Sequence, residues 1–533
     1  MFQRALALIV SLVVCQILSA QSVWTPDNGD GTYKNPIIYA DYSDPDAIRV
    51  GDDFYLTASS FNSAPGLPIL HSKDLVNWRI IGHVFQQQVP RDVFRTPQHG
   101  NGVWAPAIRY HEQSFYIFYP DPDFGIYMTK AKDPAGPWST PLLIKQAKGW
   151  IDPCPFWDTD GNAYLVHAWA NSRAGIKSIL TINRLTADGT KILDEGKMVF
   201  DGHAHHPTIE GPKLYKRNGY YYIFAPAGGV PTGWQTVLRA KDIYGPYEDK
   251  IVMDQGSTSI NGPHQGAWIE LASGESWFIH FQDRGPYGRI VHLQPMIWKN
   301  DWPVIGIDKD EDGKGEPVET YEKPNVGSRY PIENPQTNDE FSARLPGLQW
   351  QWQANFIDSW ESLSKRPGWL RLESVSVPVA SANLWSVPNL LLQKLPAPRF
   401  TVTTKIDAHG LLSGEKAGLV MMGMDYSYLA IGRTQKGFGL AKMLCREAPK
   451  GSKETAERSI SSVAAKIFLR VSVGNDALCQ FSYSLNGRRF QNIGEPFKAR
   501  EGRWIGAKVG LFALAKNNAQ RTGYADFDWV RFE

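Results

Sequence analysis

One unit, a polar turn followed by an aromatic-rich strand, recurs five times between Asn35 and Trp298. The five copies read VGDDFYLTASS, YHEQSFYIFY, DTDGNAYLVHA, YKRNGYYYIFA and LASGESWFIHF, and they start at Val50, Tyr110, Asp158, Tyr215 and Leu271. Their turns contain the Gly, Asp and Asn residues that tight hairpins require, and their strands alternate as half-buried strands do. Repeats spaced by roughly 50 to 60 residues are typical of propeller blades, each of which is a sheet packed on its neighbours. We therefore predict an all-β fold that begins with a five-bladed β-propeller.

The rest of the chain has a different texture. A charged, proline-containing stretch, residues 307–338, interrupts the repeats and is typical of a linker. Residues 339–533 contain alternating strands with polar turns and few helix caps, which predicts a β-sandwich whose first and last strands pair. Because 533 residues exceed what one hydrophobic core usually serves, two domains are expected. We assign residues 21–306 to the propeller, 307–338 to the linker and 339–533 to the sandwich.

The first 20 residues predict a secretory signal peptide. One Arg precedes an uninterrupted apolar stretch, which ends on small residues at Ser19 and Ala20. Lipoprotein processing at Cys15 is disfavoured, because Val14 before it is not a small residue. We therefore expect cleavage near Ala20 and export to the periplasm or the medium. No other stretch approaches membrane-spanning length, so we expect no membrane insertion.

Three cysteines remain after such a cleavage: Cys154, Cys445 and Cys479. They are too few for a disulfide scaffold, and they lack the CxxC spacing of a metal site. Cys445 and Cys479 are the one pair expected within a single domain, and whether they form a disulfide stays open.

The charge and the aromatic content of the chain bear on its partners. Formal net charge is +2 and the acidic and basic residues are interleaved, so we expect neither nucleic acid nor an anionic membrane surface as the main partner. Aromatic residues make up 12% of the chain, which suits the stacking of flat rings on sugars but is also common in all-β proteins. A neutral partner fits this composition best.

Three acidic residues stand outside the solvated charge runs. They are Asp44 in YSDPDAIRV, Asp152 in GWIDPCPFWD and Glu210 in PTIEGPKLY, each just before or within a different blade. Because the inner strands of a propeller converge on its central channel, these side chains can meet there. Two carboxyl groups suffice to hydrolyse a glycosidic bond, and a third beside the acid raises its pKa. Taken singly, each also fits an ordinary turn, since Asp-Pro and Glu-Gly-Pro are turn-forming sequences.

The same segments resemble glycoside hydrolase family 43, five-bladed propeller enzymes that act on arabinose- and xylose-containing plant polysaccharides. NPIIYADYSDPDAIRVGDDFYL, WIDPCPFWDTDGNAYLV and EGPKLYKRNGYYYIFAPAGG are similar to three ordered motifs of that family. The resemblance implies that Asp44 is the general base, Asp152 the pKa modulator and orienting group, and Glu210 the general acid. It also implies inversion of configuration, for which the base and acid carboxyl groups would lie roughly 6.5 to 9.5 Å apart. We interpret Asp41 and Asp46 as groups that cap the turn or support Asp44.

Further assignments follow from this resemblance. In NGPHQGAWIE, His264 would lie in the channel and help to hold a water-bound structural calcium ion; no cofactor is otherwise required. In YGRIVHLQPMIW, Arg289 would reach the substrate. We assign Phe61 and Trp104 to the substrate-binding site as rings that contact the sugar. Past the linker, DEFSARLPGLQWQW and RPGWLRL are similar to the concanavalin-like sandwich of the β-xylosidase-type branch.

The identity of the sugar is less constrained than the chemistry, because the family contains β-xylosidases, α-L-arabinofuranosidases and endo-arabinanases. After Phe61, the residues Asn62, Ser63 and Ala64 replace the acidic residue and the aromatic ring of the xylosidase form, which would open the leaving-group side. We therefore predict an exo-acting α-L-arabinofuranosidase that trims arabinoxylan, arabinan or arabinosylated xyloglucan. The alternatives are a β-xylosidase acting on xylo-oligosaccharides and, in another class, a noncatalytic glycan-binding propeller.

Overall fold

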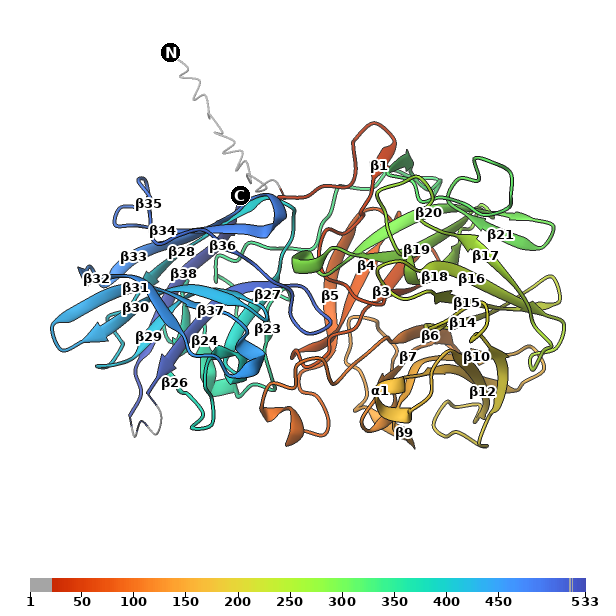
Figure 1. The fold of residues 1–533 in the computed structure, drawn as a ribbon, viewed down its shortest axis with the longest axis horizontal. Helices are drawn as coiled ribbons and strands as arrows, with labels where there is room; N and C mark the ends of the chain where they lie inside the picture. The colour runs from red at the N-terminus through yellow and green to blue at the C-terminus, as the bar shows by residue number, and fades with distance from the viewer. Residues whose placement is uncertain (1–21, 517–518, 520) are drawn as a thin grey trace, which may run out of the picture.

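The computed structural model describes residues 22–516, 519 and 521–533, so the predicted signal peptide, residues 1–20, lies outside the described residues. Nearly all regular elements are strands, and α1 (Asn171–Ala174) is the single α-helix of the described chain. The strands form two bodies side by side, with the propeller on the right and the sandwich on the left of Figure 1. This architecture confirms the predicted all-β fold of a five-bladed propeller followed by a sandwich.

Each propeller blade is an antiparallel sheet of four consecutive strands. The first blade contains β2 (Asp46–Val50), β3 (Asp53–Thr57), β4 (Gly66–Ser72) and β5 (Trp78–Phe85). The second contains β6 (Ala107–His111), β7 (Ser114–Asp121), β8 (Gly125–Ala131) and β9 (Leu142–Gln146). The third contains β10 (Trp150–Trp157), β11 (Ala163–Trp169), β12 (Ile179–Leu185) and β13 (Lys197–Asp201). The fourth contains β14 (Lys213–Arg217), β15 (Tyr220–Ala227), β16 (Trp234–Ala240) and β17 (Glu248–Met253), and the fifth β18 (His264–Glu270), β19 (Ser276–Asp283), β20 (Arg289–Lys299) and β21 (Trp302–Ile305).

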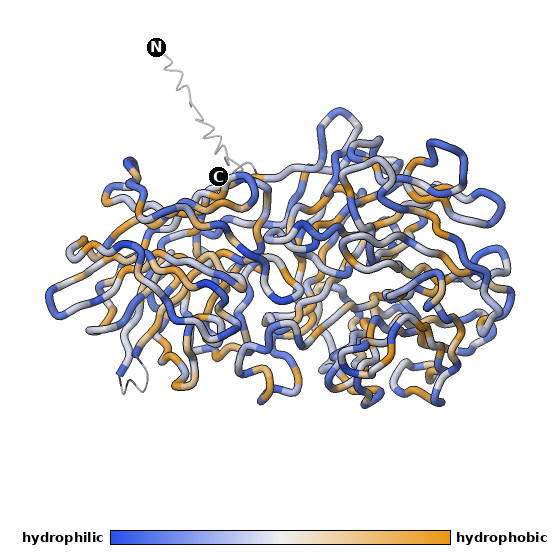
Figure 2. The backbone as a smooth tube through the Cα atoms, viewed as in Figure 1, coloured by the Kyte–Doolittle hydropathy of each residue, from blue (hydrophilic) through white to orange (hydrophobic). Residues whose placement is uncertain are grey.

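The first strands of neighbouring blades meet at the centre of the propeller. Strand β2 contacts β6 and β18, and β10 contacts β6 and β14. The blades pack through apolar faces, so hydrophobic stretches follow the strands and hydrophilic ones the outer loops (Figure 2). The residues at the start of each first strand are therefore gathered around one end of the propeller axis.

The N-terminal segment closes the propeller between its first and last blades. Ile38 forms a bridge with Val291 of β20, and Tyr33 is fully buried against the fifth blade. Strand β1 (Thr32–Lys34) pairs with β22 (Thr320–Glu322). Part of the stretch predicted as a linker thus forms a strand that packs back on the propeller.

The sandwich consists of two sheets. One has the strand order β23-β27-β37-β29-β30-β31-β32, with β26 paired to β37: β23 (Gln351–Trp352), β26 (Val375–Ser376), β27 (Leu390–Lys394), β29 (Lys416–Met422), β30 (Tyr426–Thr434), β31 (Gly437–Cys445), β32 (Thr455–Val463) and β37 (Lys508–Ala515). The other has the order β24-β25-β38-β28-β33-β34-β35, with β36 paired to β34: β24 (Glu361–Ser362), β25 (Leu370–Glu373), β28 (Phe400–Asp407), β33 (Lys466–Val473), β34 (Leu478–Ser484), β35 (Gln491–Asn492), β36 (Phe497–Lys498) and β38 (Tyr524–Phe532). Asp339, at the start of the sandwich, forms a bridge with Val530 of β38, which joins the two ends of this domain as predicted.

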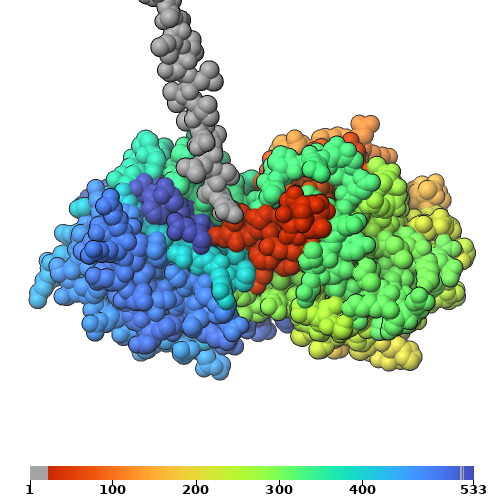
Figure 3. Space-filling model, turned by 90° about the horizontal axis from the view of Figure 1, so that it is seen from above, coloured from red at the N-terminus to blue at the C-terminus, as the bar shows by residue number. Residues whose placement is uncertain are grey.

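The interface between the domains is continuous with the sandwich core. Tyr39, Tyr287 and Ile290 of the propeller pack in the same apolar cluster as the sandwich interior. The backbone of Ala64 forms a bridge with that of Trp352. Seen from above in Figure 3, the first described residues of the chain, drawn in red, lie at the junction of the two lobes.

Cys154, Cys445 and Cys479 are free and buried. Cys445 lies on β31 and Cys479 on β34, in different sheets, so the disulfide that the sequence left open is not formed. Within the part of the chain that the structure describes, no helix has the length and apolar character needed to cross a membrane.

Candidate active site

Four predicted site residues lie at the same end of the central strands. Asp44 precedes β2, Asp152 lies near the start of β10, Glu210 precedes β14 and His264 opens β18. Asp44 and Asp152 adopt left-handed backbone conformations, with φ of 54° and 57°, which Asp tolerates better than most residues. The pairing of β10 with β11 is irregular at Asp152, and such bulges re-aim side chains next to active sites.

Asp44 is held by two donors. The Ser59 hydroxyl donates to its Oδ2 at 2.6 Å, and Nη1 of Arg289 donates to its Oδ1 at 2.7 Å. Both oxygens are thus hydrogen-bond acceptors, as in an ionised carboxylate. The Arg289 guanidinium also lies 4.8 Å from the centre of the Phe281 ring. The arginine that was predicted to bind substrate is therefore in direct contact with Asp44.

Asp152 is 2% exposed and interacts electrostatically with both other carboxylates. Burial, reinforced by the charges of Glu210 and Asp44, raises the pKa of Asp152 to about 8. Its Oδ2 accepts a hydrogen bond from the Gly211 amide at 2.7 Å, next to Glu210 in the chain. The Asp152 carboxyl group therefore retains its proton at neutral pH, directly beside Glu210.

Glu210 is the most accessible of the three acids, with 31% of its side chain exposed. Its Oε1 lies 2.9 Å from Nε2 of His264, whose side chain is 1% exposed. Nδ1 of His264 is buried and has no hydrogen-bond partner in the described chain. The calcium ion predicted at His264 stays a prediction.

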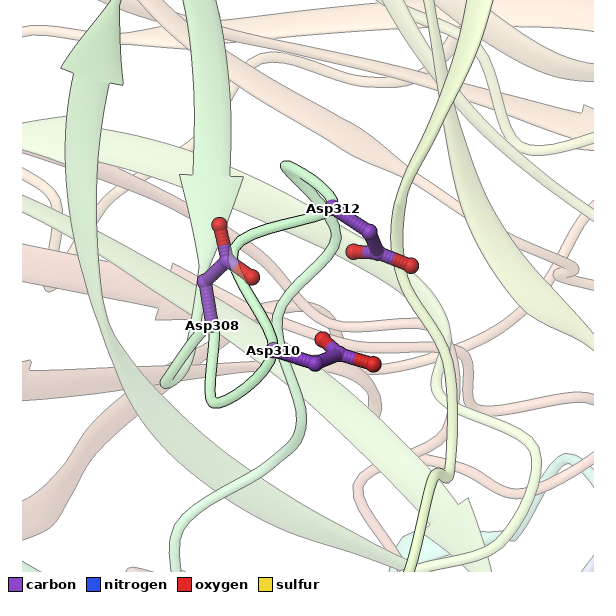
Figure 4. A group of neighbouring side chains, drawn as sticks. All are labelled: Asp308, Asp310 and Asp312. Atoms are coloured by element: carbon purple, nitrogen blue, oxygen red, sulfur yellow. The ribbon is translucent and has the colours of Figure 1, made fainter.

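The one group of metal-ligating side chains found among the described residues lies elsewhere. Asp308, Asp310 and Asp312 have carboxylate oxygens within 4.8 Å of one another (Figure 4), in the stretch predicted as a linker. The Lys314 ammonium lies 2.7 Å from Asp254 and 3.8 Å from Asp312. These carboxylates are not part of the predicted calcium site at His264.

The two predicted aromatic residues lie beside one another in the fold but contact different surroundings. The Phe61 amide donates to the Val103 carbonyl at 2.9 Å, next to Trp104, and Phe61 is only 3% exposed. The Trp104 ring lies 5.3 Å from the Arg173 guanidinium. Phe61 follows shortly after Ser59, the donor to Asp44.

The residues after Phe61 do not line an open leaving-group side, contrary to the reasoning from the sequence. The Asn62 amide donates to the Gln353 carbonyl of the sandwich at 2.6 Å, and Asn62 is 2% exposed. Ser63 accepts a hydrogen bond from the Lys508 ammonium at 2.6 Å. This segment is polar because it docks on the sandwich, so its composition says nothing about the width of the pocket.

A sandwich loop that the sequence did not point to lies beside the site. Glu501–Ile505 lines a cavity of about 300 Å³ together with Arg289. Arg503 and Trp504 also line a second cavity of about 250 Å³, whose wall includes Arg173. Trp504 is 49% exposed with φ of 63°, and nothing in its sequence context, EGRWIGAK, indicated a place beside the site.

Comparison with known proteins agrees with this geometry. Residues 33–303 match Glycosyl hydrolases family 43, and residues 338–533 match the Beta xylosidase C-terminal Concanavalin A-like domain. A β-xylosidase of Formosa agariphila is 34% identical over 593 residues, covering 99% of this chain and 98% of that protein. A non-reducing end α-L-arabinofuranosidase of Bacteroides ovatus is 28% identical over 556 residues, with coverage of 99% and 98%.

A solved structure gives the same result for the whole fold. The crystal structure of a GH43 protein from Bacillus licheniformis has a TM-score of 0.80 and 28% identity, and the match covers 94% of this chain and 99% of that chain. Both domains are thus matched, in the same order. Together with the carboxylates at the centre of its five blades, these matches establish that the chain belongs to glycoside hydrolase family 43.

Proposed function

We propose that this protein is an inverting, exo-acting glycosidase that releases xylose from the non-reducing end of β-xylosides. The observation that carries the proposal is the meeting of Asp44, Asp152 and Glu210 from three blades, with Asp152 protonated at neutral pH by its burial. A glycan-binding propeller without activity has no need of a carboxyl group held in this state, so the enzyme is favoured.

Each of the three acids has a separate role in the proposed reaction. Asp44, oriented by Ser59 and Arg289, removes a proton from the water that attacks the anomeric carbon. Glu210, the most exposed of the three acids, protonates the leaving oxygen. Asp152 interacts electrostatically with Glu210 and, by accepting a hydrogen bond from the Gly211 amide, holds the segment that carries Glu210.

The choice of xyloside over arabinofuranoside rests on two points. Residues 62–64, whose small and polar side chains favoured an arabinofuranosidase, pack on the sandwich instead of opening the leaving-group side. The β-xylosidase of Formosa agariphila is also more similar to this chain than the arabinofuranosidase of Bacteroides ovatus, at 34% against 28% identity. Because the Bacteroides ovatus relative is an α-L-arabinofuranosidase, the second candidate function is removal of arabinofuranosyl side chains from arabinoxylan, arabinan or xyloglucan.

Exo action is supported by the sandwich loop. Glu501–Ile505 lies beside Arg289, so one side of the site is walled by a second domain rather than open to a long polymer. Export through the predicted signal peptide is part of the proposal, since polysaccharides and their fragments are met outside the cytoplasm. A calcium ion, if bound, would be held through water on His264 and would add positive charge to the channel.

Parallel assays test this proposal. Purified protein is incubated with p-nitrophenyl β-D-xyloside, xylobiose and p-nitrophenyl α-L-arabinofuranoside, and kcat/KM is compared. We expect the xylosides to be preferred. A higher kcat/KM for the arabinofuranoside would favour the second candidate. If neither these substrates nor natural arabinosides were hydrolysed, the enzyme hypothesis would fail and a noncatalytic glycan-binding propeller would be the remaining interpretation.

A further inference from the structure

The carboxyl group of Asp41, three residues before the proposed base, joins three separate parts of the molecule. Its Oδ1 accepts hydrogen bonds from the Arg289 amide at 2.9 Å and from the Ser43 hydroxyl at 2.8 Å. Its Oδ2 accepts a hydrogen bond from the Gly506 amide at 3.0 Å. Asp41 is 3% exposed, so these contacts are shielded from water.

The backbones around Asp41 approach too closely for side chains. A Cβ on Gly288 would lie 2.5 Å from atoms of Asp41, and Gly288 has φ of 73°. A Cβ on Gly506 would lie 2.7 Å from the Gly288 amide nitrogen. The Ala507 amide also donates to the Pro286 carbonyl at 2.7 Å. The sandwich is thus clasped to the turn that leads into Arg289.

The two residues that Asp41 connects both border the proposed reaction site. Arg289 donates to Asp44 through its side chain, and its carbonyl accepts from the Tyr42 amide at 3.1 Å. Gly506 ends the loop whose residues Glu501–Ile505 line the cavity beside Arg289. A small shift at Asp41 would therefore move both the partner of the base and the wall of the cavity.

We propose that Asp41 is a positioning residue of the glycosidase: Oδ1 sets Arg289 against Asp44, and Oδ2 holds the sandwich loop 501–506 at the site. The inference rests on the proposed function, because it assigns Asp41 to the reaction of that site. It makes the sandwich a component of the active site rather than a separate binding module.

A purely structural role for Asp41 predicts different behaviour. Burial lowers the pKa of Lys394 and Lys508 at the domain interface, and the Asp41 carboxylate opposes that shift. Loss of the Asp41 charge would then destabilise the interface without changing the activity of the molecules that remain folded. The test must therefore separate stability from the KM and kcat of folded enzyme.

Two substitutions separate the roles of the two oxygens. In Asp41→Asn the remaining oxygen can still accept from Arg289 and Ser43, while the new amide group faces the Gly506 amide and repels it. In Asp41→Ala all three hydrogen bonds, from Arg289, Ser43 and Gly506, are lost. Gly506→Ala leaves Asp41 intact and displaces the loop sterically, so it tests the loop even where Asp41→Ala does not fold. Asp339→Asn is the matched control, since Asp339 accepts two backbone amides within the sandwich, from Phe341 and Gly347.

The measurement is the steady-state hydrolysis of p-nitrophenyl β-D-xyloside, normalised to folded protein by circular dichroism and gel filtration. We expect Asp41→Asn and Gly506→Ala to raise KM about 10-fold with kcat within about 3-fold of wild type, and Asp41→Ala to lower kcat about 100-fold as well. Asp339→Asn should lower the melting temperature alone. Unchanged KM and kcat in folded Asp41→Asn and Gly506→Ala would overturn the inference while leaving the proposed function intact. An inactive wild type would overturn both.

Discussion

At the scale of single residues, Asp152 carries features that oppose folding and serve chemistry. It is buried, it adopts φ of 57°, and burial with nearby charges raises the pKa of its carboxyl group to about 8. A left-handed non-glycine residue costs on the order of 1 kcal/mol. Such costs are typical of sites whose geometry is set by function rather than stability.

The first prediction concerns Asp152→Asn. The folded state keeps a proton that the unfolded state, with a pKa near 3.8, releases, so the stability of the wild type falls as pH rises from about 4 to about 8. An Asn side chain does not titrate, and its oxygen can still accept the hydrogen bond from the Gly211 amide. We expect activity to fall at least about 100-fold, while the melting temperature exceeds that of the wild type by a few degrees at pH 8 and by less at pH 5. A melting temperature lowered equally at both pH values would contradict this account.

The second prediction concerns Glu210→Ala, which removes the proposed acid. Leaving groups that need protonation should suffer most, so kcat/KM should fall about 10²- to 10⁴-fold on xylobiose and less on p-nitrophenyl β-D-xyloside, whose leaving group is stable as an anion. The comparison of the two substrates is the measurement. Equal losses on both would argue against Glu210 as the acid.

The proposed carboxylates could be selected from sequence because each interrupts a short apolar or Gly- and Pro-rich segment. Ser59 and Trp504 could not be selected in the same way. Ser59 supports Asp44 through the hairpin of its own blade, and Trp504 lines the cavity beside Arg289 because a second domain docks there. Long-range docking leaves no periodic signal in the chain.

At the scale of elements, neighbouring blades are fastened by buried polar contacts as well as by apolar packing. Asp46 on β2 is fully buried, and its Oδ2 accepts from the Ile108 amide at 2.8 Å and from the Arg109 guanidinium at 2.6 Å. The Arg109 side chain also lies 2.9 Å from the Cys154 sulfur of the third blade. Asp46 thus supports the packing of the blades rather than Asp44 itself.

The third prediction tests this contact. Asp46→Ala leaves the Arg109 guanidinium buried without its charge partner, so we expect a loss of about 3–5 kcal/mol in the free energy of unfolding, measured with urea. Asp46→Ala combined with Arg109→Met should recover part of that loss, because no buried charge remains. A double variant less stable than Asp46→Ala would show that the guanidinium is held well by its other contacts.

The five blades were predictable because each repeats a hairpin with alternating aromatic residues. Strand β22 was not, since three residues, Thr320–Glu322, inside a charged stretch carry too little pattern to indicate a strand. Its partner β1 lies almost 290 residues earlier in the chain, and that pairing depends on closure of the whole propeller.

At the scale of the whole molecule, the two domains share one apolar cluster and a polar seam. Lys508 on β37 is 7% exposed, donates to Ser63 of the propeller, and lies opposite Lys394 of β27. Burial and the charge of Lys394 lower the pKa of Lys508 to about 7, while Asp41 opposes the shift. The seam therefore couples domain docking to pH.

The fourth prediction is the pH dependence of Lys508→Met. Because the unfolded state, with a pKa near 10.5, binds a proton that the folded state lacks between about pH 7 and pH 10.5, wild-type stability rises with pH across that window. The substitution removes the penalty, so it should raise the melting temperature more at pH 7 than at pH 10. Lys498→Met, at an exposed position of the sandwich, is the control and should leave the melting temperature unchanged at pH 7 and at pH 10. If Lys508→Met raised the melting temperature more at pH 10 than at pH 7, the pKa of Lys508 would not be lowered in the folded state.

The central claim, an inverting xylosidase built on Asp44 and Glu210, is tested most directly by following xylobiose hydrolysis with proton NMR from the first minutes. An inverting enzyme releases the non-reducing-end xylose as the α-anomer, while the leaving xylose enters solution as the α/β mixture of the reducing end, so we expect α-xylose to exceed its equilibrium share until mutarotation removes the excess. An initial excess of β-xylose over its equilibrium share would contradict inversion, and the absence of xylose release would contradict the proposed substrate.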